Sequence, residues 1–144
     1  MSLDRNAIAT ALFALGCSSS EFKTTGQREQ MWSGTPEQPA LFLRSVSEEY
    51  PEREVRMSRV KVTLQFEFWI YYRTTDPNEA PGIQLDALIT ALEETLRPRV
   101  MQQAQTLGLP YVSHCWIRGR ILKDSGALTG QAIARIPVEV LAIS

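Results

Sequence analysis

The sequence predicts an α+β domain in which two helices pack on one face of a mainly antiparallel sheet. Three observations lead to this prediction. Residues 56–73 alternate between apolar and polar side chains over most of their length, which is typical of a half-buried strand. Two other segments repeat apolar residues at helical spacing, and the elements follow in the order helix, strands, helix, strands.

Length and charge limit the class of protein. A chain of 144 residues has the size of one ordinary domain, so a single domain over residues 1–144 is expected. The net charge of -1, from 15 basic and 16 acidic side chains, gives no reason for tight electrostatic binding to nucleic acid or an anionic membrane. The short N-terminal apolar stretch contains Asp4, unlike a signal peptide, and no run has the length of a membrane span. We therefore expect a soluble protein that is made in a cytoplasm.

The first element is a short amphipathic helix that Asp4 can cap. Leu3 before the cap and Ile8 after it have the spacing of a hydrophobic staple, and Gly16 is the expected stop signal. The inner stripe of this helix comprises Ile8, Ala11, Leu12 and Leu15.

A loop and a second strand follow the helix. Residues 17–30 are rich in Ser, Thr, Gly and charge, which is typical of a loop, and Phe22 is its expected anchor to the core. The pattern allows a short strand at residues 30–32. The turn-rich residues 33–39 then lead into a strand at residues 40–46.

The long alternating run is the central strand. Its apolar side chains are expected to face the core, and its polar side chains the opposite side. Trp69 and Tyr71 place large aromatic rings where the run otherwise carries polar residues, so we expect that end of the strand to be covered. The core-facing positions are Val60, Val62, Leu64, Phe66, Phe68 and Ile70.

Residues 47–56, here called the acidic tip, join the second strand to the long strand. Such a connection is expected to lie in solvent with few apolar contacts, and Tyr50-Pro51 stands at its centre. A mobile, charged loop with one aromatic residue is also suited to reach a partner as an arm. The candidate contact residues are Glu48, Glu49, Tyr50, Glu52, Arg53 and Glu54.

A second helix follows the proline- and glycine-containing residues 75–82 and ends before Pro98. On its polar surface Glu93 and Arg97 have the spacing of an ion pair one turn apart. Residues 99–110 give no clear element. The apolar stripe of the helix comprises Leu85, Leu88, Ile89, Leu92 and Leu96.

Two further strands complete the chain, at residues 111–122 and 131–143, with a turn-rich connection that starts at Lys123. Pro137 has no N–H to donate to a neighbouring strand. We therefore expect the last strand to lie at a sheet edge or to direct Pro137 toward an unpaired side.

No catalytic, cofactor or metal site is predicted. His114 is the only histidine, and Cys115 beside it would face the other side of a strand, so the two cannot act as base and nucleophile. One His and one Cys are too few ligands for zinc. Cys17 and Cys115 are expected to be unpaired core thiols. Residues 126–130 lack the Lys of a phosphate-binding loop.

Trp69, Tyr71, Tyr72 and Trp116 are more aromatic residues than one sheet end normally needs. They fit two interpretations, ordinary packing under loops and a surface that another subunit covers. The candidate residues at such a subunit boundary are Trp69, Tyr71 and Trp116.

Several short marks along the chain resemble the tail terminator, or tail completion, proteins of long-tailed bacteriophages, a family of minor tail proteins. The marks are Trp32, Gln38-Pro39-Ala40-Leu41-Phe42, Asp76-Pro77-Asn78, Pro81-Gly82, His114-Cys115-Trp116-Ile117, Gly119, Gly126, Gln131-Ala132 and Ile136-Pro137.

The resemblance implies a structural virion protein and not an enzyme. Such a protein forms a ring, most simply a hexamer, at the head-proximal end of the tail tube, ends tube polymerisation and joins the tail to the head connector. Its partners are further copies of itself, the tail tube protein and the connector protein. DNA only passes through the ring, no cofactor or membrane is involved, and assembly takes place in the cytoplasm of the host bacterium.

Three alternatives remain open at this point. A neck or head-tail adaptor protein belongs to the same class and differs in the partner that it binds. A small enzyme would use His114 with a nearby carboxylate. A monomeric regulatory binding domain is the third alternative.

Overall fold

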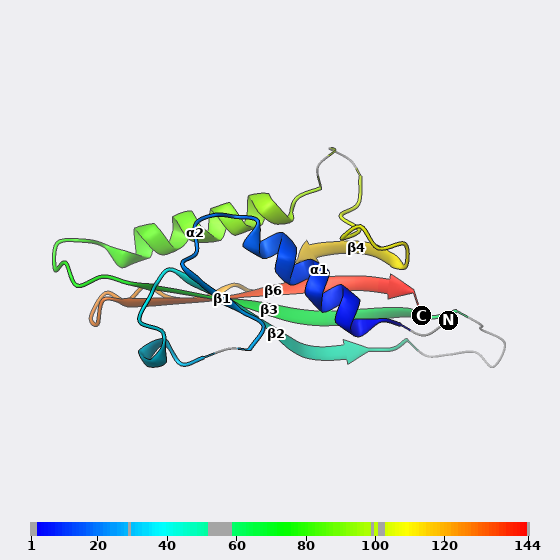
Figure 1. Cartoon of the computed structure of the whole chain (residues 1–144), viewed down its shortest axis with the longest axis horizontal. Coiled ribbons are helices and arrows are strands. Elements are labelled where there is room, and N and C mark those ends of the chain that lie inside the picture. The colour runs from blue at the N-terminus through cyan, green and yellow to red at the C-terminus, as the bar shows by residue number, and fades with distance from the viewer. Residues whose placement is uncertain (1–2, 29, 52–58, 99, 101–102, 144) are drawn as a thin grey trace.

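The computed structural model describes residues 3–28, 30–51, 59–98, 100 and 103–143 of the chain. These residues form an α+β fold in which both helices lie on one side of the sheet, as predicted (Figure 1). The elements in chain order are α1 (Arg5–Cys17), β1 (Thr24–Gly26), the 3-10 helix η1 (Trp32–Gly34), β2 (Ala40–Glu49), β3 (Lys61–Arg73), α2 (Pro81–Leu96), β4 (Val112–Ile117), β5 (Leu122–Asp124) and β6 (Gln131–Ile143).

The strands of the sheet are ordered β1-β2-β3-β6-β4. The short β5 pairs with the same edge of β6 as β4 does, but with an earlier stretch of β6. Among the described strands only β1 and β2 run parallel, and all other pairings are antiparallel. The centre of the sheet is the long ladder between β3 and β6, whose register runs from Lys61 opposite Ile143 to Arg73 opposite Gln131.

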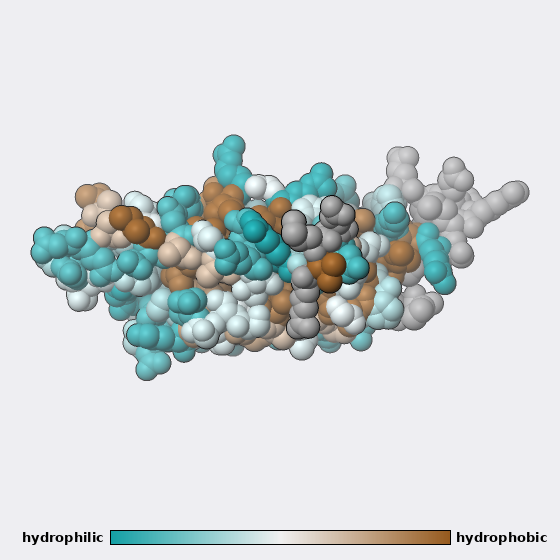
Figure 2. Space-filling view, turned by 90° about the horizontal axis from the view of Figure 1, so that it is seen from above, coloured by the Kyte–Doolittle hydropathy of each residue, from teal (hydrophilic) through white to brown (hydrophobic). Residues whose placement is uncertain are grey.

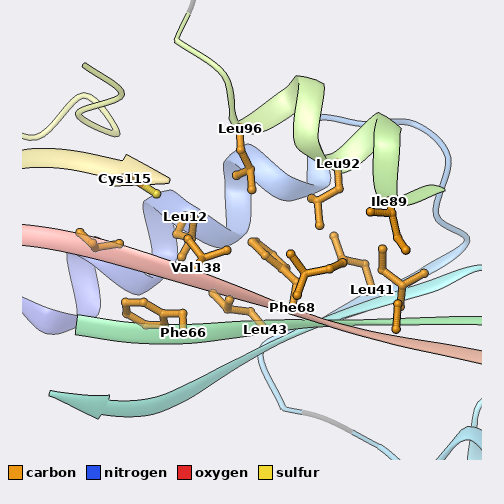
Figure 3. Packing of buried hydrophobic residues seen from close by; sticks show 14 of the residues in the cluster. Leu12, Leu41, Leu43, Phe66, Phe68, Ile89, Leu92, Leu96, Cys115 and Val138 are labelled. Carbon is orange, nitrogen blue, oxygen red and sulfur yellow. The ribbon is translucent and has the colours of Figure 1, made fainter. Parts of the chain in front are cut away.

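The alternation along β3 separates the two faces of the sheet. Its even-numbered apolar residues are buried beneath the helices, as predicted, and join the main hydrophobic core. Figure 3 shows Leu12 of α1, Leu92 of α2 and Phe68 of β3 in the layer between helices and sheet. The face on which Trp69 and Tyr71 lie is here called the outer face.

Helix α1 begins as predicted, because the Asp4 carboxylate accepts a hydrogen bond from the N–H of Ala7 at 3.0 Å. Gly16 does not end the helix, which continues to Cys17. Gly16 is buried instead, and a Cβ atom there would lie 2.8 Å from the ring of Phe68. The absence of a side chain therefore lets α1 lie close to the sheet.

The region between α1 and β2 differs from the prediction. The short strand lies at Thr24–Gly26 and not at residues 30–32, and residues 32–34 form η1. The N–H of Lys23 donates to the carbonyl of Pro39 at 2.7 Å, which holds the start of β1 against the start of β2. Phe22 is partly buried against the core, as predicted.

The predicted strand at residues 111–122 is divided into β4 and β5. The break contains Gly119, whose φ of +114° favours glycine. Pro137 of β6 lies between the residues that pair with β4 and those that pair with β5, and its carbonyl accepts from the N–H of Arg118 at 3.2 Å. β6 is thus an inner strand and not an edge, and Pro137 directs its nitrogen toward this gap, because the N and C=O of a strand residue point to the same side.

Helix α2 begins with Pro81 and buries the predicted leucine-rich stripe. It ends at Leu96 because Arg97 is extended before Pro98. None of the described helices is long and apolar enough to cross a membrane.

Candidate interaction surfaces

A second, smaller apolar cluster lies on the outer face. Ala40, Phe42 and Tyr71 are buried there, and Trp69 and Ile133 are partly buried beside them. The Tyr71 ring packs 5.7 Å from Phe42 and meets Trp69 edge to face at 6.4 Å between centroids. This end of the outer face is covered at Tyr71 by the chain itself, since the Tyr71 hydroxyl donates to the Gln30 carbonyl at 2.6 Å.

Trp69 is fixed by two charged residues of the same face. Arg135 donates from Nε and Nη2 to the two oxygens of Glu67, at 3.0 and 3.2 Å, and its guanidinium lies 4.9 Å from the centroid of the Trp69 ring. The indole N–H of Trp69 also donates to Glu67, at 2.6 Å. A half-buried aromatic ring held in one orientation loses little entropy when a partner packs on it.

Trp116 lies on the outer face as well, but not beside Trp69. Trp116 pairs with Glu139 of β6, and Glu139 pairs with Gln65 of β3. Gln65 precedes Trp69 by four residues along β3, so Trp116 and Trp69 are separated by roughly 13 Å along the strand direction. Tyr72 lies on the helix-covered side, where its hydroxyl binds the Glu79 carboxylate and this bond raises its pKa to about 12. The four aromatic residues therefore do not form one patch, and the assignment of Trp69, Tyr71 and Trp116 to a subunit boundary remains a prediction.

His114 and Trp116 form a stacked pair, with ring centroids 4.4 Å apart. The N–H of Gln105 donates to Nδ1 of His114 at 3.1 Å, so the neutral ring carries its proton on Nε2. Cys115 points the other way into the core, as predicted, and burial raises the pKa of its thiol to about 12. A thiol in this state is a poor nucleophile.

The acidic tip begins later than predicted, because β2 extends to Glu49. Arg5 at the start of α1 donates to the Glu48 carboxylate at 2.5 Å and to the Tyr50 hydroxyl at 2.8 Å. Glu48 and Tyr50 are therefore bound to the N-terminal helix, although both are exposed, as is Glu49. The other candidate residues, Glu52, Arg53 and Glu54, lie outside the described residues.

A hollow of about 610 Å³ lies on the outer face, on the half of the sheet away from Tyr71. Glu139 is buried in it, and one carboxylate oxygen lies 3.1 Å from Nη1 of Arg118 without the geometry of a hydrogen bond. This contact is an ion pair, because opposite charges attract at this distance whatever the angle. Sequence reasoning missed Glu139, although one acidic residue within an otherwise apolar stretch of strand was a visible signal.

The opposite end of the molecule, where α2 begins, carries exposed apolar side chains. Ile83 of α2 and Leu128 of the turn between β5 and β6 are largely in solvent. Ile83 lines a second hollow of about 440 Å³, together with Pro81, Asp86 and Lys123. Leu128 is the next residue after Ala127, which also lines this hollow. Figure 2 shows apolar surface at this end of the molecule. The sequence patterns do not single out these residues.

Within the described residues there is no group of three or more His, Cys, Asp or Glu side chains that could hold a metal ion. Cys17 and Cys115 are both free thiols, and Cys17 is only partly buried. No carboxylate of the described part of the chain is hydrogen-bonded to His114.

Comparison with known proteins gives one kind of match. No protein-family model matches the chain, and no curated protein matches it. A similar solved structure is a chain from the "Virion of native gene transfer agent (GTA) particle", with a TM-score of 0.55 and 7% sequence identity over 96% of each chain. At this identity the likeness shows a common fold.

Proposed function

We propose that this chain is a structural virion protein and that it acts as the tail terminator of a long-tailed bacteriophage or a related particle. In this role it forms a ring at the head-proximal end of the tail tube. The ring ends tube polymerisation and joins the tube to the head connector. Its partners are its own copies, most simply six in a ring, together with the tube protein and the connector protein.

The observation that carries the proposal is the likeness in fold to a chain of a gene transfer agent virion. The match covers 96% of both chains, so it extends over nearly the whole architecture and is not limited to one common motif. Because a fold can host many functions, the proposal also draws on the short marks that resemble tail terminators. These marks and the fold comparison are separate observations, and both indicate a particle protein.

The charge of the chain suits a ring through which DNA passes. A net charge of -1 gives the ring little attraction for phosphate, whereas a strongly basic lumen would retain DNA through counterion release. The described surface mixes both signs, as in the pairs between Arg135 and Glu67 and between Arg118 and Glu139. We therefore expect DNA to be cargo of the ring and not a bound ligand.

A terminator must bind the tube through one face of its ring and leave the other face unsuited to more tube protein. The two ends of this molecule differ in this way. The end of the molecule where α2 begins exposes Ile83 and Leu128. The opposite end of the molecule, where β2 ends, exposes Glu49 at the acidic tip. Apolar residues favour a permanent contact, while charged residues favour selection among partners.

The proposal is tested by deleting the gene for this chain from the phage or prophage that encodes it and examining the particles by electron microscopy. A terminator deletion is expected to give tubes of uncontrolled length without heads. Complementation with the unaltered gene is the control, and it should restore tails of one length on filled heads.

Other outcomes contradict this role. Tails of normal length that are separate from heads would assign the chain to the neck instead. Normal particles after deletion, or particles in which mass spectrometry does not detect the chain, would overturn a virion role altogether. His114→Ala tests the enzyme alternative, which is removed if this variant supports assembly as well as the unaltered protein does.

A further inference from the structure

The end of the molecule where α2 begins presents apolar side chains that the described part of the chain leaves uncovered. Leu128, in the turn between β5 and β6, is fully exposed, and Ile83 of α2 is largely exposed. Figure 1 shows this turn, in orange, and the start of α2 at the same end of the molecule. The hollow of about 440 Å³ lies between them, and its apolar lining includes Pro81, Ile83, Leu85 and Ala127. Exposed apolar side chains that gather beside a hollow are typical of an interaction site.

The turn that carries Leu128 is held by hydrogen bonds of the chain itself. The N–H of Gly130 donates to the carbonyl of Gly126 at 2.8 Å, and the N–H of Thr74 donates to the carbonyl of Gly130 at 2.9 Å. The N–H of Gly126 also donates to the Asp124 carboxylate at 3.0 Å. The turn is therefore closed on itself and joined to the residue that follows β3. Because the turn is held before binding, little conformational entropy is lost when a partner packs on Leu128.

The two sides of the hollow are also held together. Lys123 of β5 donates to the Asp86 carboxylate of α2 at 3.2 Å. A Cβ atom at Gly82 would lie 3.2 Å from the Cβ atom of Ser125, so the absence of a side chain lets the start of α2 approach the turn. The hollow is thus formed without a partner, and it can receive an apolar side chain without rearrangement of the backbone.

Carboxylates surround this apolar surface. The residues around the hollow, 74–86 and 122–129, carry four carboxylates and one ammonium group, which are those of Asp76, Glu79, Asp86, Asp124 and Lys123. The ammonium group is already paired with one of the four carboxylates. The end therefore attracts a partner that presents basic side chains and repels one that presents acidic side chains.

We propose that this end, here called the apolar end, is the face of the ring that binds the tail tube. The tube protein would meet it with an apolar side chain that enters the hollow and with flanking Lys or Arg side chains that lie near the carboxylates, while Leu128 packs against the tube protein. This inference rests on the proposed function, because it assigns the tube-binding face of the proposed terminator. A second copy of the chain is a poorer occupant, since its own apolar end or its Glu49 would bring carboxylates against carboxylates.

The apolar end suits the tube better than it suits the connector. A contact that stops growth must persist in competition with further tube protein. Burial of apolar side chains gives such a contact more free energy than exposed ion pairs do, because exposed pairs contribute little. The carboxylates around the hollow then act mainly on the choice of partner and on the rate of encounter.

Labelling of tube ends tests the inference. Tubes are purified from cells that lack the gene for this chain, and the purified full chain with an affinity tag is added and located by gold particles in electron microscopy. The unaltered chain should label tube ends. The variant with Ile83→Ser and Leu128→Ser should need about tenfold more protein for the same labelling, because truncation of central interface residues has an effect of this size.

A second variant tests the charges. Asp76→Asn, Asp86→Asn and Asp124→Asn are combined, and each new side chain keeps an oxygen that can accept the hydrogen bonds that Asp76 and Asp124 accept from the backbone. Labelling by the unaltered chain should weaken as the salt concentration rises, because salt screens the attraction to basic side chains. The triple variant should label fewer tube ends at low salt and should depend less on salt.

Two control variants change the surface away from the apolar end. Val100→Ser removes another exposed apolar side chain, and Glu93→Gln with Glu94→Gln removes two exposed carboxylates from the last turns of α2. Both should label tube ends as the unaltered chain does. Circular dichroism checks that each variant folds, and light scattering measures its oligomeric state.

Four results would overturn the inference. The first is a folded Ile83→Ser and Leu128→Ser variant that labels tube ends as well as the unaltered chain does. The second is a loss of oligomeric state in that variant, which would make the surface a contact between copies. The third is a triple Asn variant that binds like the unaltered chain at every salt concentration, and the fourth is the absence of label from the unaltered chain.

These failures can be distinguished from failure of the proposed function. If gene deletion gives tubes of uncontrolled length and any of the four results is found, the terminator role stands and the assignment of the apolar end fails. Normal tails after gene deletion would remove the proposed function and this inference with it.

Discussion

Trp69 shows at the scale of single residues how a side chain can serve the fold and still remain available to a partner. Its ring supports the Arg135 guanidinium, and its N–H binds the Glu67 carboxylate that Arg135 also binds. These contacts explain an aromatic residue at a polar position of β3 without a second subunit. The ring is nevertheless only partly buried, so it can still meet a partner.

The first prediction concerns Trp69→Ala. Because the residue is half-buried, we expect a loss of about 1–2 kcal/mol in the free energy of unfolding, below the roughly 3–5 kcal/mol of a fully buried Trp. Ring formation should weaken by more than this, by about a hundredfold in the concentration at half-dissociation, or roughly 2.7 kcal/mol. Chemical unfolding and light scattering measure the two quantities. Tyr71→Phe, which keeps the ring and removes the hydroxyl that donates to Gln30, is the control. If Trp69→Ala loses its thermal transition but never changes its oligomeric state, Trp69 is simply part of the core.

The second prediction concerns alkaline pH. Burial raises the pKa of the Cys115 thiol from 9.0 to about 12, so between these values the thiol ionises in the unfolded chain but not in the folded chain. The corresponding stability is fully present below pH 9 and is lost as the pH rises toward 12. At pH 10 the loss is on the order of 1 kcal/mol. Urea unfolding at pH 8 and pH 10 should show this difference between the unaltered protein and Cys115→Ala, and an identical pH dependence in both would contradict it.

At the scale of elements, the position of α1 depends on contacts at both of its ends. Near its C-terminal end, Gly16 lies against Phe68 of β3. At its N-terminal end, Arg5 binds Glu48 and Tyr50 at the end of β2. Helix α1 therefore depends on the sheet for its place, and the two contacts can be tested separately.

The third prediction is that Gly16→Ala destabilises the protein although alanine favours helices. The new Cβ would lie 2.8 Å from the Phe68 ring, so the helix or the ring must shift. Overpacking of this kind costs about 1–3 kcal/mol, which exceeds the helix-propensity gain of about 1 kcal/mol. Gly34→Ala is the control, because a Cβ at Gly34 would have no other atom within 4 Å and the stability of this variant should stay nearly constant. Equal unfolding midpoints for both variants would contradict the close packing of α1.

The fourth prediction concerns the acidic tip. Deletion of residues 48–54 would remove part of β2 and the hydrogen bond that Glu48 accepts from Arg5, so a substitution is the sharper test. Glu49, Glu52 and Glu54 are replaced together by Gln, which keeps chain length and leaves Glu48 in place. If the tip selects a partner by charge, this variant should fold normally and fail to complete tails.

Electron microscopy of phage that carries the triple variant should show tubes of uncontrolled length or tails unattached to heads. Glu93→Gln with Glu94→Gln on the exposed side of α2 is the control, and it should assemble normally. Tails of normal length on filled heads with the triple variant would show that the tip is only a hairpin end.

At the scale of the whole molecule, the two ends differ, because apolar side chains are exposed where α2 begins and Glu49 is exposed at the acidic tip. Such a unit can bind a different partner at each end. The fifth prediction is that the purified chain, alone or with tube protein, forms a closed ring. Six chains of 16.2 kDa give a mass of about 97 kDa, which light scattering can separate from that of a monomer. A monomer at all concentrations, with and without tube protein, would favour a regulatory binding domain.

The sequence by itself determined the features that depend on local periodicity. The alternation from Val62 to Ile70 assigned each side chain of β3 to a face, because a strand repeats every two residues. The apolar stripes located α1 and α2, and Asp4 marked the start of the first helix. These signals lie within one element, so no distant part of the chain is needed to read them.

The tertiary structure alone decided which distant residues meet. It placed Trp116 away from Trp69, joined Arg5 to Glu48 and buried Glu139 on the outer face beside Arg118. It also made β6 an inner strand. The physical reason is that strand order and register come from pairing between segments far apart in the chain, whereas a periodic pattern shows only which side of an element is apolar.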